Sequence, residues 1–192
     1  MKLVFATHNQ SKLKEVQQLL QDLPFEIISL NDLNYHDDIP ETGDTLEENA
    51  WIKAKTIFDE FGLPVFSEDT GLIVDALGGA PGVRTARYAG DNANIADNID
   101  LLLKNLRGKS NRTARFKTDI CFITDKMIKH IPGICEGQIA LEETGNDGFG
   151  YDPVFIPNGF NKSFAELGSD IKNTISHRKK AISGLIAFLT KL

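Results

Sequence analysis

The sequence contains few cysteines, no long apolar run and no excess of positive charge. Its two cysteines, Cys121 and Cys135, lack metal-binding spacing, and Cys121 lies within an apolar run, so we expect buried structural thiols. No stretch supplies the roughly 20 apolar residues that a membrane helix needs. The N-terminus passes directly into an expected strand, without the charged leader and apolar region of a signal peptide. These features predict a cytoplasmic protein without membrane contact.

The charge balance and the missing phosphate motifs narrow the choice of ligand. A net charge of −6 and a pI of about 5.2 argue against a nucleic-acid polymer as the main ligand, because such binders usually carry a basic stripe. The sequence also has neither a Walker-type loop nor a dinucleotide fingerprint. Any phosphate binding must therefore use scattered lysines, backbone amides and a metal.

Strand and helix signals alternate in the first half of the chain, and strand signals dominate the second half until its end. We expect strands at 2–6, 25–30, 65–66, 71–74, 115–124, 126–131 and 135–140. We expect helices from residue 12 onward and at 46–61, 92–106, 164–167 and 176–192. Thr45 and Glu48 form a capping-box signature, and Gly62 ends the same helix. With no repeat or linker, the pattern predicts one α/β domain over residues 1–192, with a mixed sheet divided into two lobes by a cleft.

A polar turn, residues 7–12, joins the first expected strand to the first expected helix. Open α/β folds bind ligands at such carboxyl ends of strands. Lys12 and Lys14 lie at the positive end of the helix dipole, which costs about 0.3–1 kcal/mol per charge unless an anion is also there. The turn therefore suggests a phosphate site, although both lysines could simply point into water.

The acidic candidates are Glu68 and Asp69, which we place at the end of a short strand, and Glu41 in the irregular stretch before the capped helix. Successive strand residues point to opposite faces, so we expect only one of Glu68 and Asp69 to line a given site. Mg²⁺ is typically held by one or two carboxylates with phosphate oxygens and water. A Glu41–Asp69 pair would suit that ion, whereas the alternative for each residue is ordinary solvated surface.

Aromatic and basic residues in the second half could bind a base. Residues 149–152 offer aromatic faces and a carboxylate within a glycine-rich segment, although aromatics in such segments are more often packing anchors. The basic candidates along the whole chain are Lys53, Arg84, Arg87, Lys172, His177 and Arg178. Adjacency alone does not make Ser176 and His177 a nucleophile and its base.

Taken together, these segments resemble the inosine triphosphate pyrophosphatase family nearly from end to end. The resemblance is carried by Thr7–Lys12, Glu41–Gly43, Glu48–Ala50 with Lys53, Ser67–Leu72, Gly78–Gly82, Ala86–Tyr88, Gly148–Pro153 and Ser176–Arg178. Each motif is weak alone, but their joint occurrence in this order is highly specific. Thr70 and Thr85 stand where many relatives have serine, and threonine keeps the hydroxyl.

The resemblance implies a two-lobed, mixed and twisted α/β sheet with flanking helices around a central nucleotide-binding cleft. It implies a homodimer that hydrolyses ITP, dITP and XTP to the monophosphate and pyrophosphate with Mg²⁺. The implied catalytic residues are Asp69, as the base for water, and Lys12, and the implied metal ligands are Glu41 and Asp69. The implied substrate-binding residues are Thr7, His8, Asn9, Gln10, Ser11, Lys12, Lys53, Thr70, Phe149, Gly150, Tyr151, Asp152, Lys172, His177 and Arg178, with no individual role for His8.

Two alternatives remain at this point. One is a pyrophosphatase of related fold that acts on modified pyrimidine nucleotides, but its serine- and arginine-rich N-terminal motif is absent. The other is a nucleotide-binding sensor without catalysis, against which Lys12, Glu41 and Asp69 argue.

Overall fold

The computed structural model describes residues 2–22 and 24–191, without the side chains of Ser11 and Glu15. The role predicted for the Ser11 side chain therefore lies outside the described part, as does the end of the last predicted helix at residue 192. The described strands form one six-stranded sheet in the order β2-β1-β3-β4-β5-β6. Their bounds are β1 Lys2–Phe5, β2 Glu26–Ser29, β3 Val65–Val74, β4 Thr113–Ile123, β5 Ile128–Ile139 and β6 Phe155–Pro157.

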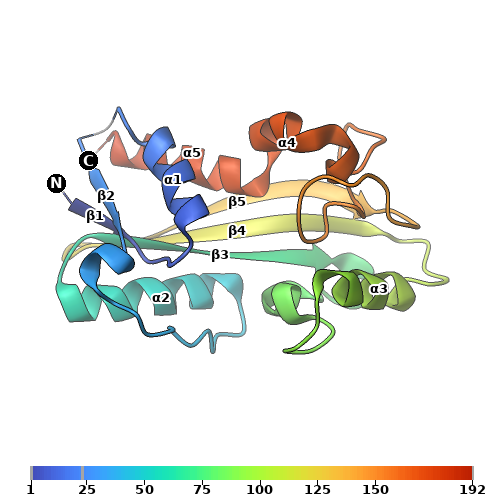
Figure 1. Ribbon diagram of the computed structural model, residues 1–192, viewed down its shortest axis with the longest axis horizontal. Coiled ribbons are helices and arrows are strands. Elements are labelled where there is room, and N and C mark those ends of the chain that lie inside the picture. The colour runs from blue at the N-terminus through green and yellow to red at the C-terminus, as the bar shows by residue number, and fades with distance from the viewer. Residues whose placement is uncertain (1, 23, 192) are drawn as a thin grey trace. The chain divides into compact units, whose positions relative to one another are not determined.

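The sheet is mixed, as predicted. β1 pairs in parallel with both β2 and β3, whereas β5 and β6 are antiparallel. The helices are α1 Gln10–Leu19, α2 Leu46–Phe61, α3 Ile95–Asn105, α4 Phe164–Ile175 and α5 His177–Leu189, with short 3₁₀ turns at Asn31–Leu33, Asp75–Leu77 and Gly82–Arg87 (Figure 1). Within the described ranges, no helix is long and apolar enough to cross a membrane.

The chain divides into two compact units. The first unit comprises Met1–Asp69, Asp119–Pro132 and Ala181–Leu192, and the second comprises Thr70–Thr118 and Gly133–Lys180. Strands β3, β4 and β5 each contribute residues to both units.

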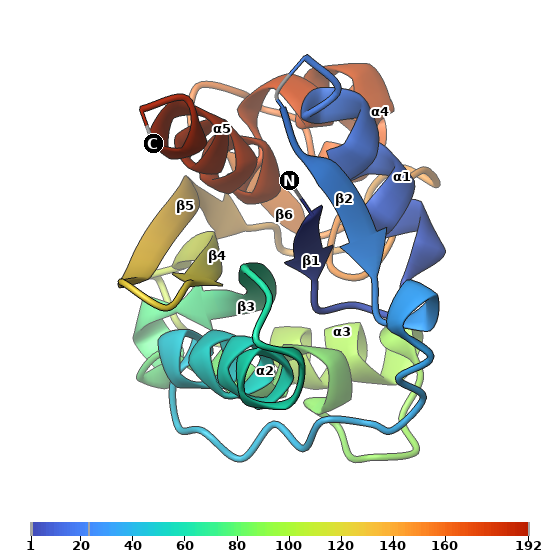
Figure 2. The same ribbon diagram turned by 90° about the vertical axis from the view of Figure 1, so that its left-hand side faces the viewer.

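Strand alternation builds the core of the first unit on two faces of its strands. On one face, α2 packs its Ala50, Ala54 and Ile57 in a buried cluster with Val4 and Val65. The neighbouring residues of the same strands point the other way, and there α1 and α5 cover a cluster that includes Leu3, Phe5, Phe66, Ile120 and Phe122. Figure 2 shows α2 on one side of β1 and β3 and α5 on the other. The two-residue period thus gives each strand an apolar contact on both faces.

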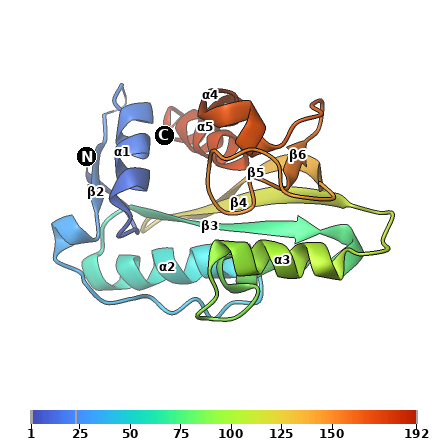
Figure 3. The ribbon, with the colours of Figure 1, turned by 45° about the vertical axis from the view of Figure 1, so that its right-hand side comes forward.

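The core of the second unit gathers side chains of α3 and α4 with those of its strands. Ile99, Leu102 and Leu106 from the α3 segment are buried together with Phe116 of β4 and Phe164 of α4. Figure 3 shows α3 and α4 on opposite sides of the strands in this unit. Cys135 is buried in this cluster and Cys121 in the first unit, and both thiols are free, so the predicted structural cysteines are confirmed.

Local signals in the sequence locate the ends of α2. The Thr45 hydroxyl accepts a hydrogen bond from Glu48 N, and the Glu48 side chain accepts one from Thr45 N, as the capping-box signature predicted. Gly62 ends the helix with φ of 64°, a left-handed conformation that favours glycine. Both predictions depend on neighbouring residues alone, and both are confirmed.

Several predicted boundaries are wrong. The polar run from Ser67 to Thr70 does not end a short strand, because β3 continues through it to Val74. The two late strands expected at 126–131 and 135–140 are a single strand, β5, which includes Pro132 and Gly133. The structure also contains β6, which the sequence did not suggest, and α4 extends to Ile175 beyond a non-helical Gly168.

Candidate active site

The polar turn before α1 is held by its own side chains. Asn9 is the N-cap, its side-chain oxygen accepting a hydrogen bond from Lys12 N at 3.0 Å. Thr7 Oγ1 accepts one from Asn9 N at 3.1 Å. The His8 ring lies 3.2 Å from both Asn31 Oδ1 and the Asp37 carbonyl oxygen. These contacts fix the turn against the loop after β2, and Gln10 begins α1 as an exposed residue.

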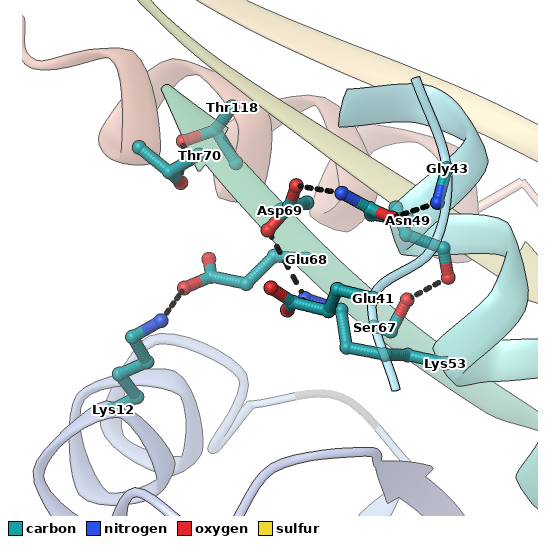
Figure 4. A network of polar contacts seen from close by, with 11 residues as sticks. Lys12, Glu41, Gly43, Asn49, Lys53, Ser67, Glu68, Asp69, Thr70 and Thr118 are labelled. Atoms are coloured by element: carbon teal, nitrogen blue, oxygen red, sulfur yellow. Dashed lines mark hydrogen bonds and ion pairs between the residues drawn. The ribbon is translucent and has the colours of Figure 1, made fainter. Parts of the chain in front are cut away.

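Lys12 does not simply point into water. Its Nζ lies 2.8 Å from Oε1 of Glu68, whose side chain is only 4% exposed (Figure 4). A carboxylate near the start of α1 compensates the lysine charge that the helix dipole disfavours. An anion does therefore lie beside Lys12, and here the protein itself supplies it.

Glu68 and Asp69 point in different directions from successive positions of β3, as strand alternation requires (Figure 4). Asp69 is directed toward α2, where Lys53 Nζ lies 3.1 Å from its Oδ1 and Asn49 Nδ2 lies 3.3 Å from its Oδ2. The same Lys53 Nζ is 2.6 Å from Oε1 of Glu41. The structure thus brings Glu41, Lys53 and Asp69 together around one positive charge.

Burial raises the pKa of Asp69 above its usual range. Lys53 opposes this effect by favouring the charged carboxylate, while the negative charge of Glu41 adds to it. A carboxylate with a raised pKa is a stronger base when it is ionised, which suits proton abstraction. The causes are ones that active sites use to shift pKa values: desolvation and a nearby like charge.

The Glu41 and Asp69 carboxylates fit a divalent cation of the Mg²⁺ kind. They are hard oxygen donors that already converge on a cation, the Lys53 ammonium. Among the described residues, no group of three histidine, cysteine or acidic side chains gathers as a closed metal site. A cation held here would therefore need oxygens from a phosphate and from water, as is usual for Mg²⁺.

A pocket of about 220 Å³ in the first unit is lined by Glu41 and Lys53 of this cluster and by the Lys12–Glu68 pair. Its polar lining residues are Thr7, His8, Lys12, Asp38, Glu41, Lys53 and Glu68. Pockets for whole small molecules are usually about 300–1,000 Å³, so this one has room for only part of a nucleotide-sized ligand. The wall thus offers two lysines to an anionic group and carboxylates to a cation that accompanies it.

Thr70 and Thr118, both in the second unit, form a hydroxyl pair. Their Oγ1 atoms lie 2.7 Å apart between β3 and β4 (Figure 4). Thr118 therefore fixes the hydroxyl of Thr70, a residue that the family resemblance assigned to substrate binding. Thr118 itself carried no signal in the sequence, because its importance depends on pairing between distant strands.

The glycine-rich loop of the second unit places a lysine between an aromatic ring and a carboxylate. Lys172 Nζ lies 3.9 Å from the centroid of the Phe149 ring and forms an ion pair with Asp152. Asp152 is buried, and its Oδ2 also accepts a hydrogen bond from Phe149 N at 2.9 Å. Phe149 is 64% exposed as a residue, so its ring can also stack on a ligand from solvent.

Tyr151 differs from Phe149 in that its side chain packs inside the unit. Its ring is 4% exposed within the core of the second unit, and its hydroxyl donates a hydrogen bond to the Thr85 carbonyl oxygen at 2.9 Å. Burial raises the pKa of this hydroxyl. Tyr151 therefore anchors the loop, Gly150 makes its turn with φ of 62°, and Phe149 alone presents an open ring.

His177 and Arg178 begin α5, directly after the Ser176 that ends α4. The His177 ring is largely buried and stacks on Phe116, with ring centroids 4.8 Å apart. Arg178 is half-buried. Both lie in the second unit, as do Phe149, Asp152 and Lys172, whereas the predicted phosphate and metal residues up to Asp69 lie in the first.

Sequence reasoning assigned no role to Asn49, which lies in the Glu48–Ala50 motif. Asparagine is a poor helix former. An asparagine inside the predicted helix, one turn before Lys53, could therefore have indicated a functional role for Asn49. The partner of Glu68 could not be inferred in the same way, because it comes from a helix more than fifty positions away in the chain.

Comparison with known proteins places this architecture in one group. The profile described as the Ham1 family matches residues 3–188. A "dITP/XTP pyrophosphatase" of Christiangramia forsetii is 50% identical over 100% of both chains, and one of Porphyromonas gingivalis is 48% identical over 98% of this chain and 97% of the other. Among solved structures, a HAM1 protein from Coxiella burnetii has a TM-score of 0.96 at 41% identity over 100% of both chains. The Staphylococcus aureus Ham1 protein has a TM-score of 0.94 at 37% identity, covering 100% of this chain and 99% of that one.

The fold is thus that of a group of mixed α/β proteins with solved members. Within it, the chain belongs to the Ham1 family. The resemblance seen in the sequence motifs is confirmed.

Proposed function

We propose that this protein hydrolyses non-standard purine nucleoside triphosphates (ITP, dITP and XTP) to the monophosphate and pyrophosphate, and so removes them from the nucleotide pool. Relatives that are named dITP/XTP pyrophosphatases and match nearly the whole chain support this activity. The observation that carries the proposal is the convergence of Glu41, Lys53 and Asp69 beside a lysine-lined pocket. A sensor without catalysis would not need a carboxylate with a raised pKa at this place.

In this proposal the first unit binds the phosphates. The turn at residues 7–12 and Lys53 contact the triphosphate, while Glu41 and Asp69 hold Mg²⁺, with Thr70 adding a hydroxyl. When bound, Mg²⁺ would supply charge neutralisation at the phosphate oxygens. Lys12 stabilises the negative charge that develops in the transition state, and it becomes available to a phosphate as its pairing with Glu68 loosens.

Asp69 acts as the general base in this scheme. It accepts a proton from the water that attacks the α-phosphorus in line, and pyrophosphate leaves with the electrons of the broken P–O bond. Burial in the protein makes Asp69 more basic than a surface carboxylate. Asn49 and Lys53 orient the group from the side of α2.

The second unit binds the nucleoside. Phe149 stacks on the base with its open face, and Lys172 and Asp152 lie next to that ring. Arg178 and a ring N–H of His177 donate hydrogen bonds to the oxygen at position 6 of hypoxanthine or xanthine. Adenine has an amino donor there, and a buried mismatch of this kind costs on the order of 1–3 kcal/mol.

The resemblance also supports a homodimer that works in the cytoplasm. Two free, buried thiols are consistent with a reducing compartment. Gel filtration with light scattering would test the dimer directly: a mass near 21.2 kDa would contradict it.

Hydrolysis of a nucleotide panel tests the proposed activity. ITP, XTP, dITP, GTP, ATP and dTTP are each incubated with Mg²⁺, and pyrophosphate is measured separately from orthophosphate. We expect pyrophosphate mainly from ITP, XTP and dITP, and none in the presence of a chelator. Release of orthophosphate, or equal rates on all six nucleotides, would contradict the proposal.

A further inference from the structure

Helix α2 presents two side chains to β3 one turn apart, and each of them makes the same kind of link. Lys53 connects Asp69 to Glu41. Asn49 connects Asp69 to Gly43: its Nδ2 donates to Asp69 Oδ2 at 3.3 Å, and its Oδ1 accepts from Gly43 N at 2.8 Å (Figure 4). The carboxylate of β3 is therefore tied twice to the segment that carries Glu41.

The link through Asn49 is the more enclosed of the two. Asn49 is only 1% exposed, and its amide uses both ends in these two hydrogen bonds. A Cβ atom at Gly43 would lie 2.6 Å from Glu48 Cβ and 2.9 Å from Asn49 Oδ1. Only glycine therefore lets the backbone approach the helix closely enough to reach the Asn49 oxygen.

The two links also differ in charge. The Lys53 ammonium occupies the same two carboxylates that a divalent cation would use, so the two positive charges compete. The Asn49 amide is neutral and binds the other oxygen of Asp69, so a cation does not compete with it. Asn49 can therefore hold the two acidic residues in register whether or not Lys53 keeps its place.

We propose that Asn49 is a positioning residue that aligns Asp69 with the Glu41–Gly43 segment. It acts through Asp69 and contacts neither substrate nor cation. This inference rests on the proposed function for its effect on turnover, but its effect on the Gly43 amide is independent of any activity. Groups that orient metal-binding carboxylates typically change affinity or activity by about 10–100-fold when they are removed.

Two variants test the hydrogen bonds at the two ends of the Asn49 amide separately. Asn49→Leu keeps the approximate size and loses both hydrogen bonds. Asn49→Asp keeps an acceptor for Gly43 N but replaces the donor to Asp69 with an oxygen. We expect kcat on ITP to fall about 10–100-fold in both variants, with KM changed by less than about threefold, because Asn49 does not touch the substrate. By ¹⁵N NMR of the cation-free protein, the Gly43 amide should lose its protection from hydrogen exchange in Asn49→Leu and keep it in Asn49→Asp.

Ser67→Ala is the matched control. The Ser67 hydroxyl donates to the Ala50 carbonyl oxygen and so joins the same helix and strand, but it contacts neither carboxylate. We expect it to lower the melting temperature while kcat stays within about twofold and Gly43 stays protected. If Ser67→Ala reduced kcat as much as Asn49→Leu, the loss would reflect helix–strand packing and the inference would be overturned.

Other outcomes also decide the matter. Unchanged kcat in either Asn49 variant would overturn the inference while leaving the proposed function intact, and so would a Gly43 amide that stays protected in Asn49→Leu. A wild-type protein that hydrolyses none of the three substrates would instead refute the proposed function. In that case the exchange of the Gly43 amide would still decide whether Asn49 holds the segment.

Discussion

Each unit contains a shielded lysine–aspartate pair, and the two pairs differ in what surrounds them. In the first unit, Lys53 is shared between Asp69 and Glu41, so two negative charges face one positive charge. In the second, Asp152 has Lys172 to itself, its Oδ2 also accepts a backbone hydrogen bond, and the ammonium packs on the Phe149 ring. The first cluster, Glu41, Lys53 and Asp69, keeps an excess of negative charge that can attract a cation. The second cluster, Phe149, Asp152 and Lys172, has no excess charge and satisfies its own polar groups, so it shapes the glycine-rich loop.

This contrast predicts that Asp69 matters for activity more than for stability. Replacing it by asparagine preserves the shape but removes the proton acceptor, so we expect kcat on ITP to fall by about 10²–10⁴-fold.

The effect on stability has the opposite sign. Because the pKa of Asp69 is raised in the folded state, folding favours the protonated carboxyl, and the free energy of unfolding of the wild type decreases as pH rises from about 3.8 through the folded-state pKa. Asp69→Asn lacks this loss, and its melting temperature at pH 7 should be no lower than that of the wild type.

Asp59→Asn provides the control for charge, because Asp59 is an exposed residue of α2 paired with Lys55. It should retain wild-type kcat. Near-normal turnover of Asp69→Asn would refute the role of Asp69, whereas a large drop in its melting temperature would show that this carboxylate is a structural group like Asp152.

The opposite behaviour is expected for Asp152. Asp152→Ala leaves Lys172, whose side chain is 12% exposed, without its carboxylate and also removes the acceptor for Phe149 N. Breaking a buried pair in this way costs about 3–5 kcal/mol of unfolding free energy. Urea denaturation would measure the loss, with Asp59→Ala, which breaks an exposed pair, expected to cost less than about 1 kcal/mol. Equal losses in the two variants would remove the distinction between the clusters.

The same contrast explains which parts of the molecule the sequence could predict. The ends of α2 were predictable because Thr45, Glu48 and Gly62 act on their own neighbours. The continuity of β3 was not, because the polar residues Glu68 and Asp69 look like a strand end. They are accommodated within the strand by lysines from α1 and α2, which lie far away in the chain.

For the site, the residues alone suggested a phosphate turn and a pair of metal-binding carboxylates, and only the family resemblance supplied the individual roles. The buried position of the Tyr151 side chain could not be predicted, because the sequence does not distinguish an exposed aromatic residue of a loop from a packed one. Its hydrogen bond to Thr85 joins segments that no local pattern connects. Asn49 was overlooked because both of its partners lie outside α2.

The closed nature of the second cluster can be tested through its glycines. A Cβ atom at Gly148, which has φ of 87°, would lie 2.3 Å from Asp152 Oδ2. Gly150 has φ of 62° but no atom within 4 Å of the same added carbon. We expect Gly148→Ala to lose about 2–3 kcal/mol of unfolding free energy from strain and overpacking together. Gly150→Ala should lose only about 1 kcal/mol from strain, and equal losses in urea denaturation would mean that the loop can open away from Asp152.

The excess negative charge of the first cluster leads to the smallest predicted effect. Lys53→Met removes the ammonium that competes for Glu41 and Asp69. The nucleotide-free variant should then bind Mg²⁺ more tightly, by about three- to tenfold, because a like charge roughly 4 Å away costs on the order of 1 kcal/mol even in water. Turnover should fall all the same, because the variant loses a phosphate contact.

Calorimetric titration with Mg²⁺ measures the affinity of the nucleotide-free protein. Lys55→Met is the control, because it removes a charge from the same helix without touching either carboxylate. If both variants bind Mg²⁺ equally well, Lys53 does not compete with the cation, and the two lysine–aspartate pairs are more alike than their surroundings indicate.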